Sequence, residues 1–249
     1  ADLLAKHYGD AARAVSLFSD SLADPGPHQG PAARRLAELL GHAGRWTEAG
    51  TMLQRAIDLE TSDDERALLW ANLGRLTRDR LGNLAYARVC FESALELRPT
   101  DAKTLSSLIR LLETLGDQEA MDQALSRAID LAEDVATLIE LRTQRGNLLW
   151  RTLRRYGDAV AEFEEVLGLD RHHAESRRAL ARLYVEIGDG PKALAFHRNT
   201  VIENPLEVAS YRALAETFRG TGRRDAWIQA LQTLVVLRTA DGEERELVE

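Results

Sequence analysis

The feature that most constrains the fold is a slot for a small residue that recurs at a nearly fixed spacing. Starting from Ala49, the slot recurs at Ala87, Met121, Ala159, Ala193 and Trp227. The steps between successive positions are 38, 34, 38, 34 and 34 residues. Small side chains belong where two packed helices cross closely. A period of this length is typical of repeat proteins, in which each unit contacts only its neighbours.

One stretch carries the repeat most completely. Its marker residues are, in order, Trp70, Leu73, Gly74, Ala87, Phe91, Ala94 and Pro99. In type and spacing they resemble the tetratricopeptide repeat, whose signature is Trp-x2-Leu-Gly, then Ala-x3-Phe, then Pro over about 34 residues. Thr77 stands where that family has an aromatic residue. The resemblance implies an all-α fold, a right-handed α-solenoid of stacked antiparallel helix hairpins that binds other proteins, is not an enzyme and needs no cofactor.

The pattern predicts a single solenoid with a partial repeat at its start. We expect the partial repeat at 1–26 and full repeats at 30–63, 64–100, 101–134, 135–170, 171–206 and 207–240. Residues 241–249 are expected to form a cap or to start a further helix. Because neither end has a clean solvating helix, further repeats of the same chain are expected beyond both ends.

Glycine and capping patterns predict where the helices begin and end. Turns are expected at Gly44, Gly82, Gly116, Tyr156-Gly157, Gly188 and Gly222. Ser62 and Glu65 have the spacing of a capping box, and Asp101 is expected to cap the helix that follows it. The two steps of 38 predict extra residues near Leu81 and near Thr152-Leu153.

Composition and motifs exclude several classes of function. The formal charge of -8 and pI near 5.4 disfavour a protein that mainly coats nucleic acid. The single cysteine, Cys90, is expected to be a buried apolar side chain. No apolar run reaches the roughly 20 residues of a membrane helix, and the expected location is the cytoplasm. No H-E-x-x-H, G-x-G-x-x-G, phosphate-loop or G-x-S-x-G motif occurs, so neither a metal nor catalysis is expected.

Arginines are enriched on the first helix of each hairpin, which lines the inner wall in the proteins that the chain resembles. The expected partner-binding residues are Arg34, Asn72, Arg75, Arg78, Arg110, Asn147, Trp150, Arg178, Arg182, Arg212 and Arg219. Guanidinium groups bind carboxylates with two parallel hydrogen bonds. We therefore expect a protein or peptide partner that is acidic or presents a carboxylate. A compensating acidic stripe is expected on the second helices, at Glu92, Glu96, Glu162 and Glu165.

Other interpretations of these arginines stay open. They can equally form a solvated face that pairs with acids of adjacent helices. An RNA-binding helical repeat would need aromatic side chains beside the arginines, and Trp150 alone stands there. The chain can also be a regulatory or targeting arm of a larger enzyme or assembly.

A carboxylate clamp of the kind that some tetratricopeptide domains use for chaperone peptides is a further possibility. Arg34, Asn72 and Lys103 fall in three matching slots. Glu38 and Ser107 stand where that clamp has Asn and Arg. A negative charge inside a carboxylate site opposes binding, so the match disfavours this clamp.

Overall fold

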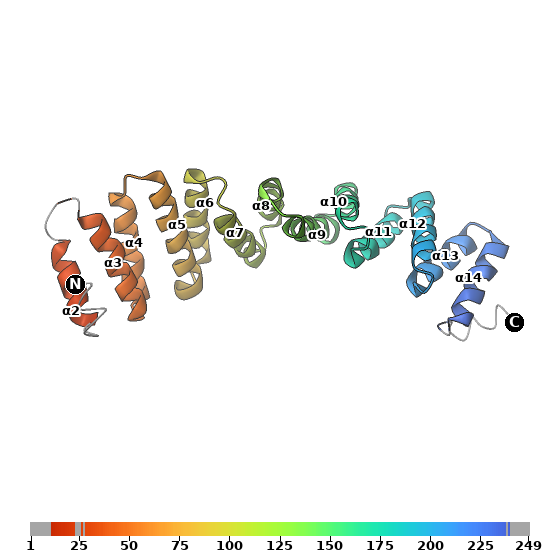
Figure 1. Cartoon of the computed structure of the whole chain (residues 1–249), viewed down its shortest axis with the longest axis horizontal. Coiled ribbons are helices and arrows are strands. Elements are labelled where there is room, and N and C mark those ends of the chain that lie inside the picture. The colour runs from red at the N-terminus through yellow and green to blue at the C-terminus, as the bar shows by residue number, and fades with distance from the viewer. Residues whose placement is uncertain (1–10, 23–25, 27, 238, 240–249) are drawn as a thin grey trace. The chain divides into compact units, whose positions relative to one another are not determined.

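The computed structural model describes residues 11–22, 26, 28–237 and 239. Every regular element within these residues is a helix (Figure 1). Packing divides the chain into two compact units, Ala1–Asp134 and Val135–Glu249. The predicted segment 241–249 and the first ten residues of the partial repeat lie outside the described residues.

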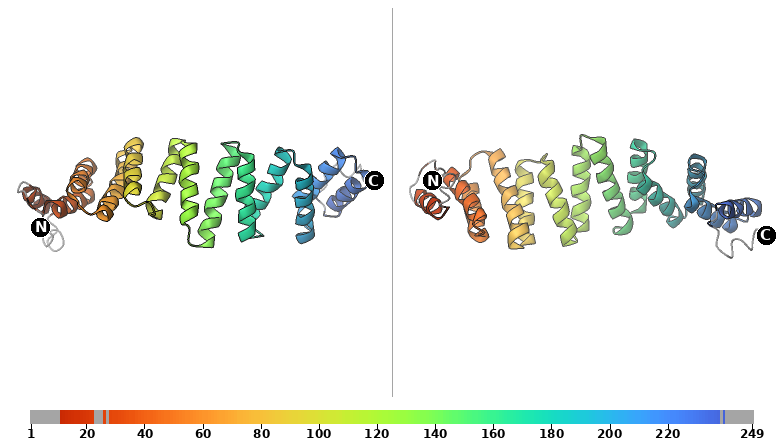
Figure 2. Two further views of the ribbon diagram at one scale, coloured as in Figure 1. Left: turned by 90° about the horizontal axis from the view of Figure 1, so that it is seen from above. Right: turned by 60° about the horizontal axis from the view of Figure 1, so that its bottom comes forward.

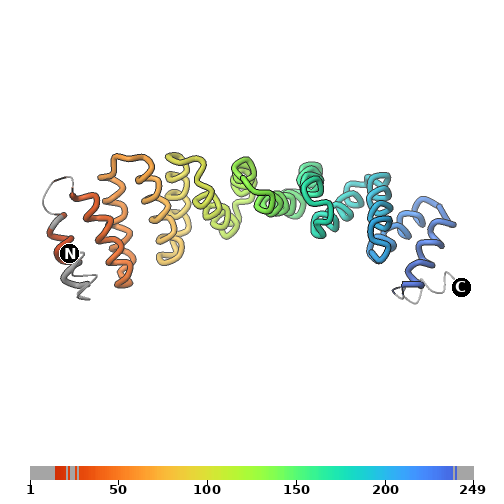
Figure 3. The backbone as a smooth tube through the Cα atoms, in the orientation of Figure 1, coloured from red at the N-terminus to blue at the C-terminus, as the bar shows by residue number. Residues whose placement is uncertain are grey.

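Both units are rows of antiparallel helices (Figure 3). Unit 1 contains α2 (Ala11–Ser21), α3 (Gln29–His42), α4 (Trp46–Leu59), α5 (Asp63–Leu76), the π-helix η1 (Thr77–Leu81), α6 (Leu84–Leu97), α7 (Ala102–Leu115) and α8 (Gln118–Leu131). Unit 2 contains α9 (Val135–Arg151), α10 (Tyr156–Leu169), α11 (Ala174–Glu186), α12 (Gly190–Glu203), α13 (Val208–Gly220) and α14 (Arg224–Val236).

The helices pack as consecutive hairpins (Figure 2). In unit 1 the pairs are α3 with α4, α5 with α6 and α7 with α8; in unit 2 they are α9 with α10, α11 with α12 and α13 with α14. The second helix of one hairpin also packs on the first helix of the next, as α6 does on α7 and α12 on α13. The predicted all-α stack of hairpins is confirmed. The exact repeat boundaries and the single solenoid stay predictions.

Interlocking of small and large residues holds the hairpins together. Ala87 and Ala159 are completely buried. A Cβ atom on Gly74 of α5 would lie 2.7 Å from Cε1 of Phe91 on α6. A Cβ atom on Gly146 of α9 would lie 2.9 Å from Cζ of Phe163 on α10. In both hairpins a glycine therefore makes room for a fully buried phenylalanine ring of the facing helix.

Five of the six predicted turns are made by glycines with a left-handed backbone. Their φ angles lie between 67° and 74°, a region that favours glycine because it has no Cβ; they are Gly44, Gly82, Gly116, Gly188 and Gly222. The sixth prediction was wrong. Gly157 lies inside α10, and Arg154 makes the turn with a φ of 56°.

The structure also shows where the longer repeats hold their extra residues. α5 continues into η1, whose five residues carry the first helix on to Gly82. α9 has 17 residues, where α3 and α7 each have 14. The extra length of α9 lies at its start, since 11 residues precede Gly146 whereas 7 precede the equivalent Ile109 of α7. Both longer first helices still pack on their second helices, α5 on α6 and α9 on α10.

Polar caps define the helix starts, with one departure from the expected pattern. Asp101 accepts hydrogen bonds from the backbone N–H groups of Lys103 and Thr104, as predicted. Ser62 accepts one from Glu65 N at 3.5 Å. The return half of the predicted capping box is not made, because the Glu65 carboxylate binds Arg34 and the Ser62 N–H donates to Glu60.

Candidate functional site

A cavity of about 880 Å³ lies among three helices of unit 2. Arg178 and Arg182 of α11 line one side of this α11–α13 cavity. Ala213 and Glu216 of α13 line the other side, and α12 contributes Phe196, His197 and Thr200. The structure thus places two of the predicted partner-binding arginines at a hollow large enough for a ligand.

Neither arginine has a carboxylate partner among the described residues. The Nε of Arg178 donates to the backbone oxygen of Ala174 at 3.2 Å, which directs the side chain along its own helix. Arg182 is exposed and makes no polar contact with any described residue. By contrast, Arg177 pairs with Glu203 at 3.0 Å in the same cavity. Two guanidinium groups therefore remain available to a ligand.

His197 is a buried polar residue in a core position. It stands where Phe91 and Phe163 stand in their repeats, and only 4% of its surface is exposed. Its Nδ1 lies 3.3 Å from Oγ of Ser210, and its buried Nε2 has no partner in the described residues. Desolvation lowers the pKa of this imidazole, so it is neutral at neutral pH.

The predicted residues of unit 1 are partly paired. Arg75 donates to Oδ1 of Asn72, and no described carboxylate pairs with Arg75 or with the exposed Arg110. Arg78 donates to Oδ1 of Asp79 at 2.6 Å. The hydrogen bond from Arg78, helped by the charge of Arg110, lowers the pKa of the Asp79 carboxyl. Asp79 was missed in the sequence, and it neutralises part of the expected positive row.

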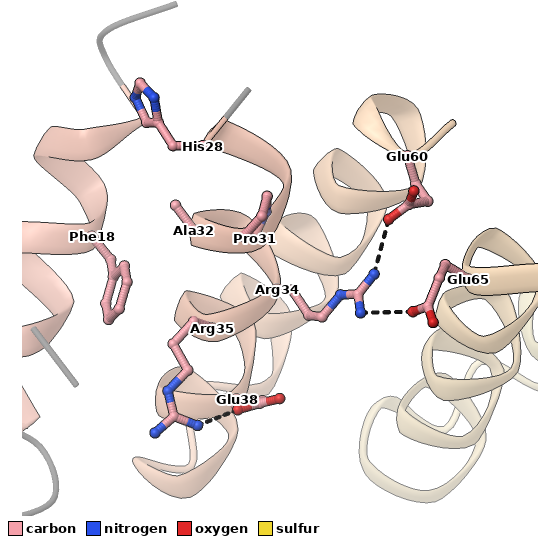
Figure 4. A pocket seen from close by; sticks show the side chains of 9 residues that line it. All are labelled: Phe18, His28, Pro31, Ala32, Arg34, Arg35, Glu38, Glu60 and Glu65. Carbon is pink, nitrogen blue, oxygen red and sulfur yellow. Dashed lines mark hydrogen bonds and ion pairs between the residues drawn. The ribbon is translucent and has the colours of Figure 1, made fainter. Parts of the chain in front are cut away.

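Arg34 joins two neighbouring helices instead of standing free. Its Nη2 lies 2.9 Å from Oε2 of Glu60 and its Nη1 lies 2.8 Å from Oε2 of Glu65, at the edge of a cavity of about 700 Å³ (Figure 4). Figure 4 also shows Arg35 paired with Glu38 beside the same cavity. For these two arginines, pairing with nearby acids is what the structure shows.

The two predicted residues of α9 donate hydrogen bonds to α11. Trp150 is 6% exposed and its Nε1 donates to Oε2 of Glu186 at 2.8 Å. The Nδ2 of Asn147 donates to Oε1 of Glu175 at 2.8 Å. The RNA-binding interpretation required an exposed ring for base stacking, and the Trp150 ring is buried.

The last two predicted arginines lie on α13. Nη2 of Arg212 donates to the backbone oxygen of Thr239 at 2.6 Å. The guanidinium carbon of Arg219 lies 5.8 Å from the centre of the Trp227 ring, a cation–π distance. Arg212 thus contacts the segment that follows α14, and Arg219 contacts α14 itself.

Glu162, which was expected in an exposed acidic stripe, instead belongs to an ionic cluster within unit 2. Glu162 is 7% exposed and binds two arginines of α9, Arg142 at 2.9 Å and Arg145 at 2.6 Å. In the 64–100 repeat the three equivalent slots hold Trp70, Leu73 and Cys90. Charged residues in slots that are otherwise apolar were the sequence signal that could have predicted this cluster.

The described residues offer neither a reactive thiol nor a metal site. Burial raises the pKa of the Cys90 thiol to about 11, so the thiol is protonated and unreactive at neutral pH. No group of His, Cys, Asp and Glu in the described part of the chain could hold a metal ion. None of the described helices is long and apolar enough to span a bilayer.

Comparison with known families agrees with the hairpin geometry. A family model described as tetratricopeptide repeat matches residues 152–218, which include α10, α11 and α12 and most of α13. Over these residues the chain is similar to tetratricopeptide repeats. Such repeats generally serve as interaction modules for proteins or peptides. No curated protein matches this sequence.

Solved tetratricopeptide and related structures share the fold at low identity. A chain in the structure of Naa15/Naa10 bound to HypK-THB is 17% identical with a TM-score of 0.71, over 99% of this chain and 37% of that one. A repeat protein of Cytophaga hutchinsonii is 13% identical with a TM-score of 0.54, over 100% and 98%. YrrB, described as having an unusual peptide-binding site, is 16% identical with a TM-score of 0.50, over 79% and 95%.

Proposed function

We propose that the chain is a non-catalytic scaffold that captures an acidic segment of a partner protein. The observation that carries the proposal is the unpaired state of Arg178 and Arg182 at the α11–α13 cavity. Exposed arginines on a solvated face would be expected to find acids on adjacent helices, as Arg34 does. These two do not, although the chain as a whole is acidic.

The arrangement suits capture of a carboxylate-bearing segment. Arg178 and Arg182 are four residues apart on one helix, so their side chains lie on the same face. Planar guanidinium groups form paired hydrogen bonds with carboxylates, which gives orientation as well as attraction. Arg75 and Arg110 in unit 1 form no ion pair with a described carboxylate, but Arg75 donates to Asn72 and the charge of Arg110 acts on Asp79.

The test uses short peptides selected from a random display library against the wild-type chain. Isothermal calorimetry then compares wild type, Arg178→Glu/Arg182→Glu and a control, Arg198→Glu/Arg224→Glu, which changes net charge equally at exposed sites away from the cavity. Acidic side chains should recur in the selected peptides. The cavity reversal should weaken binding about tenfold or more, and the control should retain it.

Salt dependence provides a second readout on the same peptides. Raising the salt from about 0.1 M to about 1 M shortens the Debye length from about 10 Å to about 3 Å, so affinity should fall. Binding that survives the cavity reversal in full would refute the proposal.

A second candidate function rests on the likeness to the Naa15/Naa10 structure. The chain matches 37% of that longer chain at a TM-score of 0.71. This supports the alternative that the repeats form an arm of a larger assembly. Size-exclusion chromatography of the native protein from its source would distinguish the two, because an arm would elute with its assembly.

A further inference from the structure

The α11–α13 cavity carries charge of opposite sign on its two sides. Arg178 and Arg182 stand on the α11 side, while Glu207 and Glu216 stand on the α13 side. Arg182 and Glu216 occupy the same slot of successive repeats, 34 residues apart. The cavity therefore presents acids as well as the arginines expected from the sequence.

The charges of this cavity fall into a satisfied group and an unsatisfied group. Glu203 is neutralised by Arg177 and Arg171, whereas Glu186 of α11 accepts a hydrogen bond from the uncharged Trp150 indole and keeps its charge. The side chains of Glu207 and Glu216 form neither a hydrogen bond nor an ion pair with a described residue.

No bond crosses the cavity between the unpaired groups. Glu207 precedes α13 without capping it, and Glu216 lies in α13 about two and a half turns further along. Neither pairs with Arg178 or Arg182, although all four line one hollow. The cavity thus holds two acids and two bases apart, with both pairs open to a ligand.

Small and apolar side chains also line the cavity, beside the polar His197, Thr200 and Ser210. Ala181 comes from α11, Ala209 and Ala213 come from α13, and Phe196 comes from α12. Val185 adds an apolar side chain that is 60% exposed. Small side chains leave room for the body of a bound helix, and exposed apolar atoms give it a surface to bury.

We propose that this cavity binds an amphipathic helical segment of a partner whose apolar stripe is flanked by acids on one side and bases on the other. The proposal rests on the proposed function and deepens it by naming the partner's charge pattern. Acids of the segment pair with Arg178 and Arg182, and its bases pair with Glu207 and Glu216. Reversing the helix exchanges its flanks, so this pattern also fixes the direction in which the segment lies.

A uniformly acidic segment fits less well. One of its flanks would face Glu207 and Glu216, and like charges placed together across an interface are costly. A uniformly basic segment would meet the same problem at Arg178 and Arg182. Selectivity by repulsion is a general way to reject the wrong partner.

The probes are three synthetic helical peptides that share one length and one leucine stripe. The first has glutamates on one flank and lysines on the other, the second has glutamates on both, and the third has lysines on both. Fluorescence anisotropy with the full chain should give the tightest binding for the first peptide, by about tenfold over either of the others.

Changing one side of the cavity should change the preferred peptide. Glu207→Arg/Glu216→Arg makes both sides basic, so the all-glutamate peptide should become the tightest binder. Arg178→Glu/Arg182→Glu makes both sides acidic, so the all-lysine peptide should become the tightest. Circular dichroism should show an unchanged helical signal in both variants, because exposed charges contribute little to stability.

The outcomes separate this inference from the proposed function. If the all-glutamate peptide binds wild type as tightly as the two-signed peptide, the inference is overturned and the acidic-partner function stands. If the preferred peptide does not change with the variants, the inference is likewise overturned. If none of the three peptides binds wild type, both are overturned.

Discussion

The close contact between Gly74 and Phe91 predicts a specific response to one added methyl group. In Gly74→Ala, the new Cβ would lie 2.7 Å from Cε1 and 2.8 Å from Cδ1 of the Phe91 ring, and 3.2 Å from Cβ of Cys90. Phe91 and Cys90 are both fully buried, so the ring has no open space into which it could move. We expect the substitution to destabilise the α5–α6 hairpin.

Two opposing effects set the size of the loss. Replacing glycine by alanine inside a helix stabilises it by about 1 kcal/mol. Overpacking a filled core costs about 1–3 kcal/mol. The expected net loss is therefore about 0–2 kcal/mol. A matched control is Gly168→Ala in α10, where a Cβ would meet nothing within 4 Å, and where only the helix gain of up to about 1 kcal/mol should be seen.

Urea denaturation followed by circular dichroism measures both variants. A double-mutant cycle with Phe91→Leu tests the contact itself, since the smaller side chain makes room for the methyl group. The coupling energy should be about 0.5–3 kcal/mol, with the double variant less unstable than the sum of the singles. Strict additivity, or a Gly74→Ala as stable as Gly168→Ala, would refute the close-contact reasoning.

Two further predictions concern buried ionisable groups of unit 2. Burial lowers the folded pKa of His197, so the unfolded chain takes up a proton first, and stability present above about pH 6.5 should be lost as the pH falls below it. His197→Phe should reduce the change of the denaturation midpoint between about pH 7 and pH 5, whereas His172→Gln at an exposed site should not. If the midpoint of both variants changes equally with pH, the prediction is contradicted. Glu162→Gln should lower the free energy of unfolding, measured by urea denaturation, by about 1–3 kcal/mol. The loss is smaller than for breaking a fully buried ion pair, because the arginine partners keep about a fifth of their side chains exposed. Glu165→Gln, at a side chain 64% exposed, should cost much less, and equal losses would rule out the cluster's role.

The hairpin architecture was predictable because its determinants are local and periodic. Small and large residues at fixed offsets imply crossing helices, and glycines between them imply turns. The turn before α10 escaped prediction because Arg154 adopts the left-handed backbone there, which a non-glycine residue rarely does. The nearest glycine, Gly157, became part of the helix.

The candidate site was less predictable because its properties depend on contacts between distant residues. Arg34 and Arg178 occupy the same slot of their repeats, yet Arg34 finds two acids that lie 26 and 31 residues away, and Arg178 finds none among the described residues. Trp150 occupies an inner-wall position by sequence, but in the structure it is buried and its indole N–H donates to Glu186 of α11. The slot alone does not determine whether a side chain is free.

The sign of the cavity likewise cannot be deduced from the net charge. Many acids of this chain are already engaged: Asp101, Asp117 and Asp189 cap helices, where the exposed N–H groups favour negative charge. Others, such as Glu162, neutralise arginines within a hairpin. A ligand responds only to the charges that remain unpaired beside it, because paired groups are already neutralised. A chain of net charge -8 can thus present free arginines on one side of a cavity and free glutamates on the other.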